Sequence, residues 1–180
     1  MYMAHTNFRP IVGSKLVYSH KAEGMSVSGS VNGLVPPTPE YEAFLEKLAA
    51  NPLLHNDFSA ETLKNLNPEV LVYLHNYVAD SEGWAHSLQL LEDGSADYLK
   101  HKPAQLDQVV RWMVVDPNHE AFGLALPSTS GPTGKTAERK KGAVRSLGPD
   151  ETFVVELEAG ALGPQEAGRA AAAVERLLDG

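Results

Sequence analysis

The fold is decided by residues 69–79, which read EVLVYLHNYVA, and by the segments that follow them. This stretch is rich in β-branched and aromatic residues and indicates a strand. Turn residues at 80–83 (DSEG) end it, and Asp93-Gly94 predicts a tight hairpin further on. Further strands are predicted at residues 84–91, 96–101, 109–115 and 121–126. Because no helix separates these strands, we predict an antiparallel β-sandwich or barrel rather than a parallel α/β sheet.

Shorter elements flank this meander. Thr38 as a cap, Pro39 at the first position and apolar residues at helical spacing predict a helix over 39–50. A second short helix is predicted from the Ser59 cap to about Leu66. The remaining expectations are strands at 1–4, 11–18 and 152–157, a surface loop at 19–37, and a C-terminal helix opened by Gly163 and Pro164. We treat residues 1–180 as a single, mainly β domain.

Composition restricts the class of protein. The chain has 180 residues, a formal net charge of −8 and no cysteine. The acidic balance argues against general binding to nucleic acid or to an anionic membrane. Without cysteine, disulfide scaffolds, thiolate zinc sites and iron–sulfur clusters are excluded. No apolar run reaches the roughly 18–20 residues that span a bilayer, and polar residues at 5–9 interrupt any signal peptide. We therefore predict a soluble, cytoplasmic protein.

Residues 131–136 (GPTGKT) end like a phosphate-binding loop. Thr129 stands where that motif requires its first glycine, and Gly142 interrupts the helix that would have to follow. A surface loop is therefore predicted. The same region is basic, with Lys135, Arg139, Lys140, Lys141 and Arg145. This stretch is either a solvated loop or a contact for a phosphate or carboxylate.

Histidines would cluster if the meander followed the simplest hairpin registers. Those registers place Tyr77 opposite His86, and His86 opposite His101, with His75 on the same face. Grouped imidazoles are structural, bind sugar hydroxyls or hold a metal. A slip of one residue would break this row, because neighbouring side chains point to opposite faces of a sheet.

His5 follows the first apolar segment and lies close to Asn7 and Arg9. A histidine at this point is held rigidly and partly shielded from water, as a proton donor or acceptor requires. A capping or core histidine is the alternative interpretation. The sequence contains no H-E-x-x-H motif.

The segment MYMAHTNFRP at residues 1–10 resembles the strand and turn that present the general-acid histidine in aldose 1-epimerases, the galactose mutarotase-like proteins. Similarity to an uncharacterised branch of this family continues at 110–113 (VRWM), 121–129 (AFGLALPST), 134–142 (GKTAERKKG), 153–157 (FVVEL) and 160–162 (GAL). The resemblance covers most of the chain and roughly the C-terminal half of the family domain.

The resemblance implies a galactose mutarotase-like β-sandwich with a concave sugar-binding face, and an isomerase that interconverts the anomers of a free aldose. In this mechanism His5 protonates the ring oxygen while a carboxylate removes the anomeric hydroxyl proton. Asn7, Arg9, His75 and His86 are the predicted sugar contacts. Such a mechanism needs no metal and no organic cofactor, and we predict neither.

Two departures from the family pattern bear on activity. The family's basic glutamate lies in a strand that here reads GLALP at 123–127 and holds no carboxylate. Neither Glu120 nor Glu138 can be assigned as its substitute, and Asp57 and Asp80 are candidates for the sugar-binding aspartate by composition alone. The family's upstream sugar-contacting arginine and histidine would precede Met1.

A half-domain would leave a sheet edge uncovered. We expect a homodimer to complete the layer; a truncated form or cover by the helix at 39–50 are the alternatives. Three functions stay open: an aldose 1-epimerase-like enzyme, a non-catalytic carbohydrate-binding or regulatory module, and a cupin-like metal protein that uses His75, His86 and His101.

Overall fold

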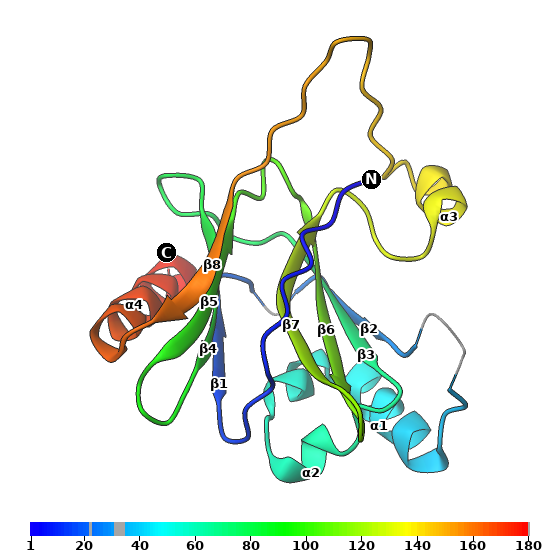
Figure 1. The fold of residues 1–180 in the computed structure, drawn as a ribbon, viewed down its shortest axis with the longest axis vertical. Helices are drawn as coiled ribbons and strands as arrows, with labels where there is room; N and C mark the ends of the chain where they lie inside the picture. Colours follow the sequence, from blue (N-terminus) through cyan, green and yellow to red (C-terminus); the bar gives the residue numbers. More distant parts are fainter. Residues whose placement is uncertain (22, 31–34, 180) are drawn as a thin grey trace.

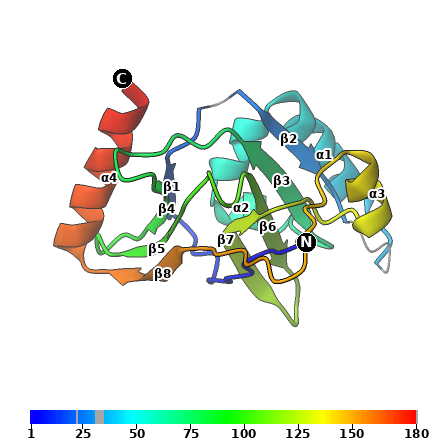
Figure 2. The same ribbon diagram turned by 90° about the horizontal axis from the view of Figure 1, so that it is seen from above.

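A computed structural model of the chain describes residues 1–21, 23–30 and 35–179. Two four-stranded antiparallel sheets face each other, with helices around them (Figures 1 and 2). The first sheet has the order β1 (Lys15–Tyr18), β4 (Ala85–Leu90), β5 (Ala96–His101), β8 (Leu157–Leu162). The second sheet has the order β2 (Met25–Ser28), β3 (Val70–His75), β6 (Gln108–Val115), β7 (Glu120–Ser128). The predicted mainly β, antiparallel sandwich is confirmed.

The main hydrophobic core lies between the two sheets. Alternate residues of β3 enter it from one sheet, and Ala85 and Leu99 enter from the other. Tyr41 and Leu48 of α1 (Pro39–Ala50) and Leu63 of α2 (Ala60–Leu63) join the same core. These helices therefore close one end of the space between the sheets (Figure 1).

The outer face of the first sheet is covered by α4 (Pro164–Asp179) (Figure 2). Ala167 and Val174 of this helix pack on Val17, Leu88 and Ala96 of the sheet. This helix begins at Pro164, directly after Gly163, as predicted. None of the helices in the described parts of the chain is long and apolar enough to cross a membrane.

The N-terminal segment runs along the edge of β7 (Figure 1). The Ala4 amide donates to the Pro127 carbonyl at 3.0 Å, and Phe8 and Phe122 exchange hydrogen bonds of 2.8 and 2.9 Å. The predicted strand at 1–4 is thus present only as isolated bridges. This edge contact is what brings His5 onto the second sheet.

The starts of α1 and α2 agree with the caps predicted from the sequence. Thr38 Oγ1 accepts a hydrogen bond from the Tyr41 amide at 3.2 Å, and Ser59 Oγ accepts one from the Thr62 amide at 3.2 Å. The second helix is shorter than predicted, and a 3-10 helix at Pro52–Asn56 was not predicted.

Three strand predictions were wrong in position. The loop predicted at 19–37 contains β2, although residues 22 and 31–34 of that loop lie outside the described residues. The last strand begins at Leu157 rather than at residue 152. The hairpin predicted between 69–79 and 84–91 does not form, because Asn76 adopts a positive φ of 66° and ends β3. As a result, β3 and β4 belong to different sheets.

The turn between β4 and β5 is one residue longer than predicted. The Leu91 amide donates to the Ser95 carbonyl at 2.9 Å, so Ala85 pairs with His101 and His86 pairs with Lys100. This slip of one residue turns His86 and His101 to opposite faces of the first sheet. The predicted row of Tyr77, His86 and His101 is therefore wrong.

Candidate functional site

The outer face of the second sheet carries polar and aromatic side chains in cross-strand rows. One row pairs His75 with Gln108, a second pairs Tyr73 with Val110, and a third pairs Leu71 with Trp112. Because alternate residues of a strand share a face, these six side chains point away from the inter-sheet core. Helix α3 (Lys135–Lys140) and the loop before it lie over this face (Figure 2).

A cavity of about 640 Å³ lies between this face and the α3 segment. Hydroxyl, amide, imidazole and charged groups line it, namely those of Ser26, Ser28, Ser30, Tyr73, His75, Gln108, Thr133, Glu138 and Lys141. This mixture of donors and acceptors suits a polyhydroxylated ligand.

Glu138 holds the wall of this cavity in place. Its buried carboxylate accepts hydrogen bonds from the Gly131 amide at 2.9 Å and from the Thr133 hydroxyl, and pairs with Lys141 at 2.9 Å. Burial alone would raise the pKa of Glu138, but the Thr133, Lys141 and Gly131 donors together lower it. The GPTGKT segment therefore forms an ordered loop around a carboxylate, and α3, with only six residues, does not provide a phosphate-loop helix.

A second hollow of about 230 Å³ adjoins His5. Its lining is mostly apolar and consists of Met3, His5, Glu69, Leu71, Val110, Trp112, Leu126 and Pro132. His5 is exposed, and its ring meets Trp112 edge-on with the ring centroids 5.5 Å apart. His5 therefore lies at the edge of a cavity, in contact with an aromatic ring and open to solvent.

Glu69 brings a carboxylate into this hollow. Only 8% of the residue is exposed. Its Oε2 accepts the Trp112 indole N–H at 2.5 Å, and its Oε1 accepts the Ser30 hydroxyl at 2.8 Å. Glu69 was not among the site residues predicted from the sequence. Its signal was available, because a glutamate just before the apolar run VLV must point opposite to Val70, which is buried in the core.

The two hollows lie side by side. Gly131 and Thr133 line the larger one, and Pro132 between them lines the smaller one. Ser30 of the larger hollow donates to Glu69 of the smaller one. The two hollows therefore adjoin each other on one face, and the smaller one holds a histidine and a carboxylate, His5 and Glu69.

The predicted sugar contacts are divided among several places. His75 lines the larger cavity on the same face as His5. Asn7 is exposed, and Arg9 forms an ion pair with Glu120 at 2.6 Å beside a different hollow. His75 thus shares a face with His5 but lines a different hollow, and Arg9 is paired with Glu120 at the start of β7.

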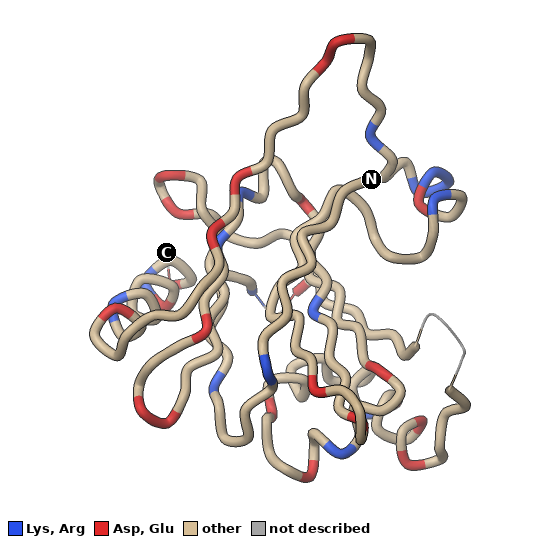
Figure 3. The backbone as a smooth tube through the Cα atoms, in the orientation of Figure 1, with Lys and Arg blue, Asp and Glu red and all other residues tan. Residues whose placement is uncertain are grey.

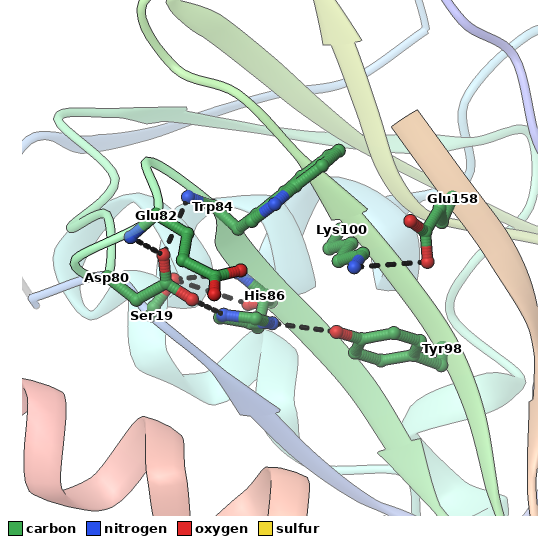
Figure 4. Close-up of polar contacts among 8 residues, drawn as sticks. All are labelled: Ser19, Asp80, Glu82, Trp84, His86, Tyr98, Lys100 and Glu158. Carbon is green, nitrogen blue, oxygen red and sulfur yellow. Dashed lines mark hydrogen bonds and ion pairs between the residues drawn. The ribbon is translucent and has the colours of Figure 1, made fainter. Parts of the chain in front are cut away.

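His86 belongs to a separate polar cluster on the first sheet, drawn in Figure 4. Its Nε2 lies 3.0 Å from the Asp80 carboxylate and its Nδ1 lies 2.7 Å from the Tyr98 hydroxyl. Burial would raise the pKa of Asp80, but hydrogen bonds from Trp84, His86 and Glu82 lower it. His86 shares its face with Leu88, which packs on α4, and therefore lies away from His5 and His75.

His101 lies in the space between the sheets, so the predicted grouping of His75, His86 and His101 around a metal is also wrong. The three side chains lie on the outer face of the second sheet, on the α4 side of the first sheet and in the interior. Among the described residues no group of three or more metal-ligating side chains comes together.

The interior also holds Arg111, for which no role was predicted from the sequence. Arg111 is 0% exposed. Its Nε donates to the Leu124 carbonyl at 2.9 Å, its Nη1 donates to His55 Nε2 at 2.6 Å, and its guanidinium lies 4.2 Å over the Tyr18 ring. The inward position between Val110 and Trp112 follows from alternation along β6, but the contacts depend on the tertiary structure.

No protein-family model and no curated protein sequence matches the chain. Comparison with solved structures finds similarity to the crystal structure of a "putative aldose 1-epimerase" from Klebsiella pneumoniae subsp. pneumoniae, with a TM-score of 0.69. The fold is galactose mutarotase-like. The two sequences are 15% identical, and the alignment covers 98% of this chain and 42% of the Klebsiella chain. The chain thus spans less than half of that neighbour, and the likeness shows the fold alone.

Proposed function

We propose that the outer face of the second sheet binds a free aldose, and that His5 donates a proton in the interconversion of its anomers. The observation that carries this proposal is the hollow of about 230 Å³ beside the His5 ring, bounded by an indole and a carboxylate. It places a titratable group next to a space of ligand size on a galactose mutarotase-like fold.

The chemistry needs a proton donor at the ring oxygen. His5 gives a proton to that oxygen as the bond between it and the anomeric carbon breaks, and the anomeric hydroxyl loses its own proton to a base. The carbonyl end of the open chain then rotates, and closure on the other face gives the second anomer. General acid–base assistance contributes about 10²–10⁴-fold for each such group.

The rest of the face supports sugar binding. Trp112 presents an aromatic surface on which the apolar side of a pyranose packs. The Tyr73 hydroxyl, the Gln108 amide and His75 of the adjoining cavity supply hydrogen bonds to hydroxyl groups. Lys141, which follows α3, lines that cavity and adds a positive charge to it. Figure 3 shows that Lys and Arg positions gather on the α3 segment.

Polarimetry and NMR exchange of freshly dissolved α-glucose and α-galactose test the enzyme. We expect the protein to accelerate mutarotation above the buffer rate, and His5→Ala to lower that excess by 10²-fold or more. His119→Ala is the matched control, since His119 is an exposed turn residue paired with Asp116. An excess rate that is absent from the wild type, or unchanged in His5→Ala, contradicts the proposal.

A non-catalytic carbohydrate-binding module is the second candidate. It is favoured by one observation, which is that Leu126 rather than a carboxylate of β7 faces the His5 hollow. For such a module, saturation-transfer NMR detects sugar binding while anomer exchange stays at the buffer rate.

A further inference from the structure

We propose that Glu69 is the proton acceptor that works with His5, and that this chain has moved its base from β7 to the start of β3. The inference rests on the proposed function. The family resemblance gives Glu69 no role. The strand that resembles the family's base strand, residues 123–127, does not contain it.

Strand β7 offers no base to the hollow. The pairing of β6 and β7 shifts by one residue between Val110 and Trp112. Because of this shift, Leu124 and Ala125 both face the inter-sheet core, and Leu126 faces the hollow. Among the described residues, β7 contributes Leu126 to the lining of the hollow, and this side chain is a hydrocarbon. A base at the hollow therefore has to come from another element.

Glu69 supplies the carboxylate among the described residues that line the His5 hollow. Among the described residues, its carboxylate accepts hydrogen bonds from the Trp112 indole of β6 and from the Ser30 hydroxyl after β2. A carboxylate fixed by such partners is pre-oriented for proton transfer, because its side chain already has the required rotamer before the substrate binds.

Trp112 contacts both the acid and the base. Its ring meets the His5 ring edge-on, and its indole N–H donates to Glu69. The ring oxygen and the anomeric hydroxyl of a pyranose are attached to the same carbon, so the acid and the base have to act at neighbouring atoms. Two groups that line one hollow and contact one side chain meet this requirement.

Two other glutamates are less suitable. Glu138 lines the larger cavity and pairs with Lys141, and its lowered pKa makes it a weaker base. Glu120 pairs with Arg9 at 2.6 Å and lines a different hollow. Glu69 is the carboxylate that shares a hollow with His5.

The proton transfers balance over one turnover. In ring opening His5 gives its proton to the ring oxygen, and Glu69 takes the proton of the anomeric hydroxyl. In closure on the other face Glu69 returns its proton to the carbonyl oxygen, and His5 takes back the proton of the attacking hydroxyl. No oxidant, reductant or further reactant is required.

Glu69→Gln tests the assignment, because the amide keeps the shape of the side chain and an oxygen for the Trp112 N–H. We expect kcat for anomer exchange to fall by 10²–10⁴-fold, while saturation-transfer NMR still detects glucose or galactose binding. Glu61→Gln, an exposed residue of α2 paired with Lys64, is the control and should keep the wild-type rate.

The outcomes separate this assignment from the proposed function. Excess exchange in the wild type together with an unchanged rate in Glu69→Gln overturns the role of Glu69 and leaves the enzyme in place. A wild type without excess exchange overturns both. If Glu69→Gln does not fold, Glu69→Ser with added formate replaces it: recovery of exchange with formate supports the base, and a folded variant without recovery overturns it.

Discussion

Arg111 and its neighbours form a buried polar cluster between the two sheets. His55 accepts a hydrogen bond from Arg111 through Nε2, and its Nδ1 donates to the Pro52 carbonyl at 2.5 Å. His101 contacts the Tyr77 ring, and neither of its ring nitrogens has a hydrogen-bond partner among the described residues. Desolvation is therefore the main cause of the lowered pKa of both histidines, and the positive charge of the Arg111 guanidinium lowers the pKa of His55 further.

This cluster predicts acid lability. Burial lowers the pKa of His55 to about 3 and that of His101 to about 4, whereas an unfolded histidine titrates near 6.5. The unfolded chain therefore binds more protons below pH 6.5, and stability is lost as the pH falls from there towards 4. Between pH 8 and pH 5 the titration of each histidine lowers the free energy of unfolding by about 2 kcal/mol. Together they should lower Tm by roughly 10 °C, as measured by circular dichroism.

Replacing one of the two histidines separates this effect from general acid denaturation. His101→Leu should remove about half of the loss in Tm between pH 8 and pH 5, because leucine cannot take up a proton. Leu147→Ala, at an exposed residue that carries no ionisable group, should leave the slope unchanged. Equal slopes in His101→Leu and the wild type would show that His101 is not titrating on unfolding.

Helix α1 packs closely on the segment that follows β2. A Cβ placed on Gly29 would lie 2.6 Å from the Tyr41 hydroxyl oxygen and 2.7 Å from Leu45 Cδ1. Tyr41 cannot simply move away, because its hydroxyl also donates to the Glu69 carbonyl. The contact between α1 and β2 thus depends on a residue without a side chain.

Gly29→Ala should therefore destabilise the protein by about 1–3 kcal/mol, the usual cost of overpacking. Chemical denaturation measures the free energy of unfolding. Gly160→Ala in β8 is the matched control, since a Cβ there meets nothing within 4 Å, and it should be neutral or slightly stabilising. A neutral Gly29→Ala would show that α1 is able to shift at little cost.

The two sheets share one core, so the molecule should unfold as a unit. Residues of β1, β4 and β5 pack in the same cluster as residues of β3, β6 and β7. Removing either sheet would expose the inner face of the other to water. The single domain over residues 1–180 and the homodimer both stay predictions.

The two tryptophans allow cooperativity to be measured. Trp84 precedes β4 in the first sheet, where Lys100 lies 4.4 Å over its ring, and Trp112 lies on β6 in the second sheet. In Trp84→Phe and Trp112→Phe the remaining tryptophan reports on one sheet each. We expect the fluorescence transition of each variant to coincide with its own circular dichroism transition. A fluorescence midpoint displaced from that of circular dichroism in either variant would indicate two separately folding units.

The sequence by itself determined what depends on neighbours along the chain. The Thr38 and Ser59 caps, the proline at the start of α4 and the apolar alternation of the meander are local, so α1, α2, α4 and the antiparallel strands were predictable. The motif around His5 also lay within ten residues, and it pointed to the histidine that lies beside a hollow.

Only the tertiary structure decided which strands pair and which side chains meet. The left-handed Asn76 sends β3 and β4 into different sheets, and one extra turn residue reverses the faces of His86 and His101. Sheet faces alternate with every residue, so an error of one residue in register moves a side chain from solvent to core. For the same reason Glu69 and His5, which are far apart in the chain, become neighbours of one hollow only after β3, β6 and the N-terminal segment have assembled.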